Sequence, residues 1–130
     1  KYLLDSHALL WFSADAVELS EKARSLILDA SDEIVVSMAS FWEISIKNAL
    51  GKLRVDGGLY ALSDVGQKNG FEILSIQFNH IALINKLPFH HRDPFDRMLI
   101  AQAIAEEMDI ISADFIFDQY LSDKPIKRIW

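Results

Sequence analysis

The stretch HHRDPFDRMLIAQAIAEEMDIISAD, residues 90–114, combines a helix start, an apolar helix and a short apolar strand. Asp93 followed by Pro94 predicts the helix start, because Asp accepts hydrogen bonds from free backbone N–H groups and Pro fits the first helical position. The apolar residues continue almost all round the helix to residue 108, which is typical of a helix buried on most of its surface. Residues 109–113 then predict a strand that leads into Asp114.

Asp96 lies within the apolar surface of this predicted helix. At about 100° per residue, it falls between Leu99 and Ala103 on one side and Ile100 on the other. An ionised carboxylate in such a place costs several kcal/mol unless a partner offsets it. The first turn of a helix favours an anion by roughly 1 kcal/mol. We therefore expect a further cationic partner for Asp96.

The composition predicts a single α/β domain over residues 1–130. The hydrophobic share is 51%, with five Gly and three Pro, which argues against disorder. The absence of cysteine excludes disulfides, thiolate zinc sites and cysteine nucleophiles. No apolar run approaches the roughly 18 residues that span a membrane, and the N-terminus has no signal-peptide pattern. We expect a cytoplasmic protein without membrane association.

The net charge of −6 argues against a broad basic surface that grips nucleic acid. A nucleic-acid enzyme with this charge would need several of its acids grouped in one site and neutralised by a divalent metal ion. The remaining acids would also suit a basic protein partner.

Predicted strands and helices alternate along the chain. The predicted strands cover residues 1–5, 33–37, 71–76, 109–113 and 125–130. The predicted helices cover residues 7–12, 20–30, 38–50, 59–69, 79–87 and 94–108, with a helical turn at 115–120. This alternation indicates a parallel sheet with helices on both faces, whose sites form beyond the carboxyl ends of the strands.

Four acids are placed to reach one pocket at that edge. Asp5 and Asp114 lie at strand ends, Asp96 lies in a first helical turn, and Glu43 shares the apolar face of the 38–50 helix. Two carboxylates about 4 Å apart repel by roughly 4 kcal/mol at an effective dielectric constant near 20. Such a group is either partly protonated or binds a hard divalent cation, and oxygen ligands suit Mg²⁺ or Mn²⁺. A two-metal site of this kind fits phosphodiester hydrolysis.

Each acid also has a structural interpretation. Glu43 and Lys47 have the i, i+4 spacing of a surface ion pair, and Asp93 and Arg97 have the same spacing, which favours a cap with an ion pair. Asp5 and Asp114 are each placed to cap the helical segment that follows them.

Two serines and a basic segment adjoin the acids. Ser6 and Ser112 either orient Asp5 and Asp114, hydrogen-bond metal-bound waters or act as caps. Residues 90–92, HHR, either contact a substrate phosphate or form a solvated loop. His7 is interpreted as a packed or surface residue rather than a metal ligand.

Four stretches resemble a known family: YLLDSHALLW, SFWEISIKNALGKL, HHRDPFDRMLIAQA and IISAD. They are similar to PIN-domain ribonucleases, specifically the VapC-type toxins of bacterial toxin–antitoxin systems, and the likeness spans nearly the full chain. The resemblance implies a three-layer α/β/α fold with a parallel sheet of about five strands. It also implies a Mg²⁺- or Mn²⁺-dependent endoribonuclease, the toxin of a type II pair, which hydrolyses RNA by metal-activated water.

The family's acidic quartet falls on Asp5, Glu43, Asp96 and Asp114. The resemblance implies that the three aspartates hold the first metal ion and that Glu43 closes the site or helps to hold a second. Ser6 and Ser112 stand where the family has Thr or Ser, and Asp93 and Arg97 remain accessory candidates. A homodimer and a cognate antitoxin that covers the pocket are further implications.

Three alternatives belong to other classes. A receiver-like or adaptor domain would bind Mg²⁺ without nuclease turnover, but a receiver needs paired acids after its first strand, where Asp5 stands alone. A pseudo-nuclease would keep the fold only for partner binding, and the complete quartet argues against it. A phosphatase with an aspartyl nucleophile needs a second acid where this chain has His7.

Overall fold

Helices and strands alternate along the chain as the sequence predicts. The computed structural model describes the backbone of residues 1–130 and every side chain except that of residue 32. The elements in order are β1 (Tyr2–Leu4), α1 (Ser6–Ser13), α2 (Glu21–Asp29), a 3₁₀ turn (Ser31–Glu33), β2 (Ile34–Ser37), α3 (Met38–Ala49), α4 (Gly58–Lys68), β3 (Glu72–Leu74), α5 (Phe78–Lys86), α6 (Pro94–Ala105), β4 (Asp109–Ile111), α7 (Ile116–Leu121) and β5 (Arg128–Ile129).

The described chain forms a five-stranded parallel sheet in the order β3-β2-β1-β4-β5. The central strand β1 is in register with both neighbours, so that Leu4 lies opposite Val36 of β2 and Ile111 of β4. Because the strands are parallel, the residues after these three positions emerge at one edge of the sheet. Asp5 and Ser112 therefore emerge side by side at this edge.

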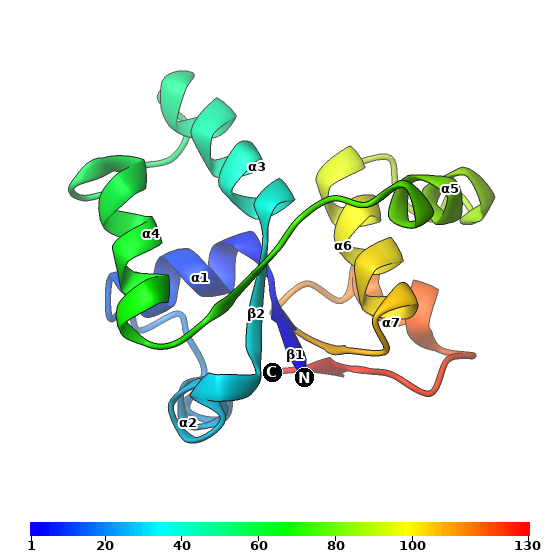
Figure 1. Ribbon diagram of the computed structural model, residues 1–130, viewed down its shortest axis with the longest axis horizontal. Helices are drawn as coiled ribbons and strands as arrows, with labels where there is room; N and C mark the ends of the chain where they lie inside the picture. The colour runs from blue at the N-terminus through cyan, green and yellow to red at the C-terminus, as the bar shows by residue number, and fades with distance from the viewer.

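Two apolar cores lie on opposite faces of the sheet. Leu3 and Ile110 point into a core shared with α6 and α7, whereas Leu4 and Ile111 point into a core shared with α1, α2, α3 and α4. This alternation follows from the two-residue period of a strand. Figure 1 places α1, α2 and α4 on one side of the sheet and α5, α6 and α7 on the other, with both termini together at one end. The predicted three-layer α/β/α architecture is confirmed.

The element boundaries differ from the predictions mainly at helix and strand ends. Helix α6 stops at Ala105 rather than at residue 108, and Glu107 takes a left-handed backbone conformation with φ 54° before β4 begins. The outer strands β3 and β5 are three and two residues long, shorter than predicted. An outer strand has a hydrogen-bonding neighbour on one side only, so less of its sequence is held in the sheet. Among the described residues, no helix is both long and apolar enough to cross a bilayer.

Candidate active site

Asp5 is the acid at the centre of the carboxyl edge, directly after β1. It caps α1 by accepting a hydrogen bond from the Ala8 N–H at 2.7 Å, and its second carboxylate oxygen accepts one from the Ser112 hydroxyl. Burial raises the pKa of Asp5, and the charge of Glu43 adds to this rise, although both hydrogen bonds oppose it. The capping role and the Ser112 contact that the sequence suggested are both present.

Glu43 reaches the same edge from α3. Its side chain is 6% exposed, and its two oxygens accept hydrogen bonds from the Ser6 hydroxyl and the Lys47 ammonium, both at 2.6 Å. The ion pair between Glu43 and Lys47 therefore forms, but it is not the surface pair considered as an alternative. The hydrogen bond to Glu43 raises the pKa of Lys47, and the charges of Asp93 and Asp96 raise it further. Lys47 thus places a positive charge among these acids.

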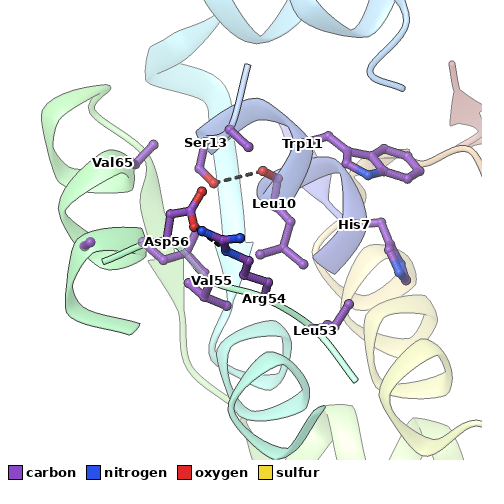
Figure 2. Close-up of a pocket in the computed structure, with 12 residues that line it drawn as sticks. His7, Leu10, Trp11, Ser13, Leu53, Arg54, Val55, Asp56 and Val65 are labelled. Carbon is purple, nitrogen blue, oxygen red and sulfur yellow. Dashed lines mark hydrogen bonds and ion pairs between the residues drawn. The ribbon is translucent and has the colours of Figure 1, made fainter. Parts of the chain in front are cut away.

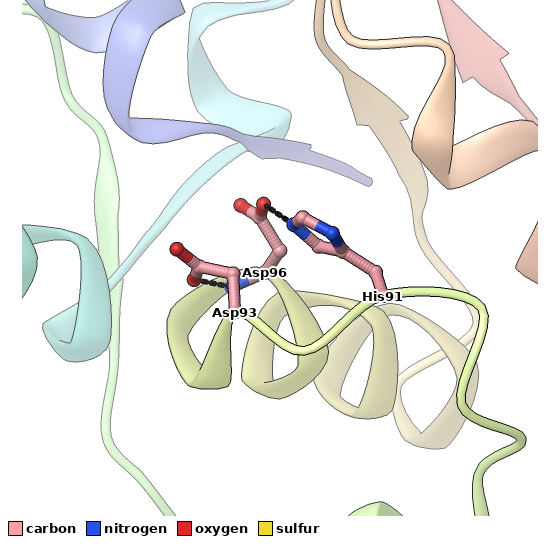
Figure 3. Close-up of side chains that lie close together, drawn as sticks. All are labelled: His91, Asp93 and Asp96. Carbon is pink, nitrogen blue, oxygen red and sulfur yellow. Dashed lines mark hydrogen bonds and ion pairs between the residues drawn. The ribbon is translucent and has the colours of Figure 1, made fainter.

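Asp96 occupies the first turn of α6. Figure 3 shows His91, Asp93 and Asp96 gathered at the start of this helix, with the Nε2 of His91 2.9 Å from the Oδ2 of Asp96. Asp93 caps the helix as predicted, accepting hydrogen bonds from the N–H groups of Phe95 and Asp96 at 2.9 and 3.0 Å. Burial raises the pKa of Asp96 to about 6, with the charge of Asp93 as the next cause, while His91 opposes the rise.

Asp114 lies at the margin of the site. It is exposed, and its carboxylate accepts a hydrogen bond from the Ile116 N–H at 3.0 Å, the capping contact that the sequence suggested. Its own N–H donates to the Ser112 hydroxyl at 3.0 Å. Because the same hydroxyl donates to Asp5, Ser112 links the two aspartates at the ends of β1 and β4.

The four acids are neighbours at one edge without forming one compact group. Ligand atoms of His91, Asp93 and Asp96 lie within 4.8 Å of one another, and among the described residues the other three predicted acids do not join such a group. Charges couple Glu43 to both Asp5 and Asp96. Each of the four carboxylates has its own hydrogen-bonding partners.

Sequence reasoning missed part of the surroundings of Asp96. The sequence predicted that residues 90–92 either contact a substrate phosphate or form a solvated loop, whereas His91 contacts Asp96 directly. The signal was the position of a histidine five residues before Asp96, across the helix start. The predicted ion pair between Asp93 and Arg97 is wrong among the described side chains, because Arg97 is buried and donates to backbone carbonyls and to Tyr120.

A separate hollow is lined by none of these acids. Figure 2 shows this pocket, about 270 Å³ in volume, between α1, α4 and the segment that joins α3 to α4. Arg54 and Asp56 pair there at 2.8 Å, and His7 and Trp11 lie at one end. None of the four acids lines this pocket, so it is not the candidate active site.

The raised pKa of Asp96 predicts a pH-dependent stability. Because the folded-state pKa of about 6 exceeds the ordinary aspartate value of 3.8, the stabilisation from the protonated carboxyl is fully present below pH 3.8, and it is lost as the pH rises through 6. At 1.36 kcal/mol per pKa unit the loss is about 3 kcal/mol. Urea unfolding in chelator should therefore show Asp96→Asn gaining roughly 2 kcal/mol, most of that loss, over the wild type between pH 4 and pH 8. A difference that stays constant with pH would contradict the perturbed carboxyl.

A family model and solved structures match most of the chain. The family model described as "PIN domain" matches residues 2–120. A chain of the VapBC2 complex from Rickettsia felis, bound to a DNA fragment from its promoter, has a TM-score of 0.71 and 12% identity, covering 98% of this chain and 96% of that one. A chain of a toxin–antitoxin complex from Klebsiella pneumoniae has a TM-score of 0.55 and 13% identity, with coverages of 98% and 95%. No curated protein matches in sequence. At these identities the structural likeness establishes the fold.

Proposed function

Because this chain belongs to the PIN domain family, we propose that it is a Mg²⁺- or Mn²⁺-dependent endoribonuclease and the toxin of a type II toxin–antitoxin pair. The observation that supports this most is the buried pair Asp5 and Glu43 beside Asp96 at the carboxyl edge of the sheet. Buried acids with raised pKa values, as Asp5 and Asp96 have here, are typical of functional sites. Grouped buried carboxylates destabilise a fold, whereas a bound cation would offset their repulsion. This arrangement therefore supports a role in cation binding.

The donor groups at this edge fit a hard divalent cation. They are carboxylate and hydroxyl oxygens, and the raised pKa values of Asp5 and Asp96 report that burial and neighbouring charge disfavour the ionised forms. Asp5, Asp96 and Asp114 would hold the ion, and Glu43 would complete the site. When bound, Mg²⁺ or Mn²⁺ would supply positive charge for the phosphate oxygens and lower the pKa of a water molecule.

The chain's own residues have separate tasks in this proposal. Ser112 holds Asp5, Ser6 holds Glu43, and His91 holds one oxygen of Asp96. Lys47 contributes a positive charge next to Glu43, which suits an approaching phosphodiester. Hydrolysis adds hydroxide to phosphorus and a proton to the leaving 3′ oxygen, so the products carry a 5′-phosphate and a 3′-hydroxyl.

We propose a cognate antitoxin and a second copy of the chain as protein partners. The antitoxin proposal draws on the two solved structures, both of which are toxin–antitoxin complexes. The acids at this edge would attract a basic side chain of an antitoxin. The net charge of −6 would likewise favour a basic protein partner.

The receiver-like alternative is disfavoured by the topology. Receiver domains have a doubly wound sheet with the strand order 2-1-3-4-5. The order here is β3-β2-β1-β4-β5, in which β1 rather than β3 is central. The remaining alternative is an adaptor domain whose acids bind Mg²⁺ without RNA cleavage.

Incubation of the purified protein with total transfer RNA tests the proposal. With Mg²⁺ or Mn²⁺ we expect discrete fragments that carry 5′-phosphates, and excess chelator should abolish them. Co-expression with a small protein encoded by the adjacent gene should suppress cleavage if that protein is the antitoxin. Fragments that persist in chelator would contradict metal-dependent hydrolysis, and intact RNA under every condition would favour the adaptor.

A further inference from the structure

Arg97 is a buried cation on α6. The residue is 4% exposed, and no ion pair among the described residues includes it. The guanidinium instead donates to four backbone carbonyls and one hydroxyl and lies 4.2 Å from the centre of the Phe89 ring. The acceptors are the carbonyls of Ile84, Leu87, Pro88 and His91 and the hydroxyl of Tyr120. One side chain of α6 thus fastens the segment that runs from the end of α5 to His91.

Tyr120, in the C-terminal helix α7, also holds this segment through hydrogen bonds to the backbone of His91. Its buried hydroxyl accepts a hydrogen bond from the His91 N–H at 2.8 Å, donates to the His91 carbonyl at 3.2 Å and accepts from Arg97 at 3.2 Å. Both backbone polar groups of His91 are therefore held by one hydroxyl group from α7. The ring of Tyr120 also stacks edge-on against His90, with centroids 5.0 Å apart.

His91 needs such support, because it lies outside any helix or strand. Its imidazole contacts the Oδ2 of Asp96 at 2.9 Å, so the position of its backbone determines whether that contact forms. The hydrogen bonds of Arg97 and Tyr120 fix that backbone between α5, α6 and α7. In Figure 3 the imidazole reaches across the start of α6 to the carboxylate of Asp96.

We propose that Tyr120 and Arg97 are positioning residues of the active site, which hold His91 so that its imidazole orients the Asp96 carboxylate. This proposal rests on the proposed nuclease function, in which Asp96 holds the metal ion. Groups that orient a metal ligand change metal affinity or activity by roughly 10- to 100-fold when they are removed. The C-terminal helix α7 thereby becomes part of the site without supplying a ligand.

The variant Tyr120→Phe removes only the hydroxyl, and Tyr60→Phe is its matched control, because Tyr60 is 90% exposed. We expect Tyr120→Phe to weaken Mn²⁺ binding or lower kcat by roughly 10- to 100-fold, with KM for RNA nearly unchanged. The imidazole nitrogen signals of His91 should shift in NMR spectra, and the His91 amide should exchange faster with solvent. Tyr60→Phe should match the wild type in every measurement. Arg97→Lys, which keeps the charge, should be less impaired than Arg97→Met.

The outcomes separate positioning from mere stabilisation. A Tyr120→Phe protein that is less stable but binds Mn²⁺ and cleaves RNA like the wild type, with unchanged His91 signals, would overturn the proposal. If the wild type cleaves no RNA, the proposed function fails. Mn²⁺ titration and the His91 signals then still decide whether the hydroxyl orients the pair of His91 and Asp96.

Discussion

Asp96→Asn is expected to lower RNA cleavage by roughly 10³-fold while the protein stays folded. A bound metal ion supplies several kcal/mol of transition-state stabilisation, and each 1.36 kcal/mol corresponds to a tenfold change in rate. The amide has nearly the size of the carboxylate, and its oxygen can still accept a hydrogen bond from His91. Initial cleavage rates with saturating Mg²⁺ measure the effect.

The same substitution should make the chain more stable at neutral pH in chelator. It removes a carboxylate whose pKa burial and Asp93 raise to about 6, so the energetic cost of ionising it in the fold disappears. The control is Asp64→Asn, which changes an exposed aspartate on α4 and should leave rate and stability unchanged. Wild-type cleavage by Asp96→Asn would remove Asp96 from the mechanism.

Mn²⁺ is expected to stabilise the wild-type chain strongly and the Asp96→Asn variant little. A ligand at 100 times its Kd that binds only the folded state adds about 2.7 kcal/mol to the free energy of unfolding. For a chain of this size that corresponds to a rise in Tm of about 10 °C. Differential scanning calorimetry with and without Mn²⁺ measures the rise.

Comparing the Mn²⁺-induced rise in Tm between variants shows where the ion binds. Asp64→Asn should gain as much as the wild type, because Asp64 is exposed on α4 and lies outside the site. Equal gains for wild type and Asp96→Asn would mean that Mn²⁺ binds elsewhere, and no gain in any variant would mean that the acids do not bind it.

Local sequence signals predicted the elements that position the acids. The capping roles of Asp5 and Asp93 follow from residue type and neighbours, and both side chains accept hydrogen bonds from the expected N–H groups. The alternation of strands and helices likewise predicted the parallel sheet, and with it the shared edge of Asp5 and Ser112. These features depend on short-range hydrogen bonding and on the period of the apolar pattern.

The partners of Asp96 and Arg97 could not be predicted in the same way. Helical spacing predicted an ion pair between Asp93 and Arg97. In the structure the Oδ1 of Asp93 accepts hydrogen bonds from two N–H groups at the start of α6. The acceptors of Arg97 lie instead in the segment before α6 and in α7. Tyr120 lies 29 residues from His91 in sequence, so no local pattern connects them. Contacts of this kind depend on how α5, α6 and α7 pack together.

The most direct measurement is an anomalous difference map from crystals grown with Mn²⁺. We expect a peak at the carboxyl edge of the sheet, within about 2.1 Å of oxygen atoms from both Asp5 and Asp96, with Glu43 and Asp114 beside it. A peak confined to His91, Asp93 and Asp96, or no peak at this edge, would contradict a shared metal site built from acids of β1, α3, α6 and β4.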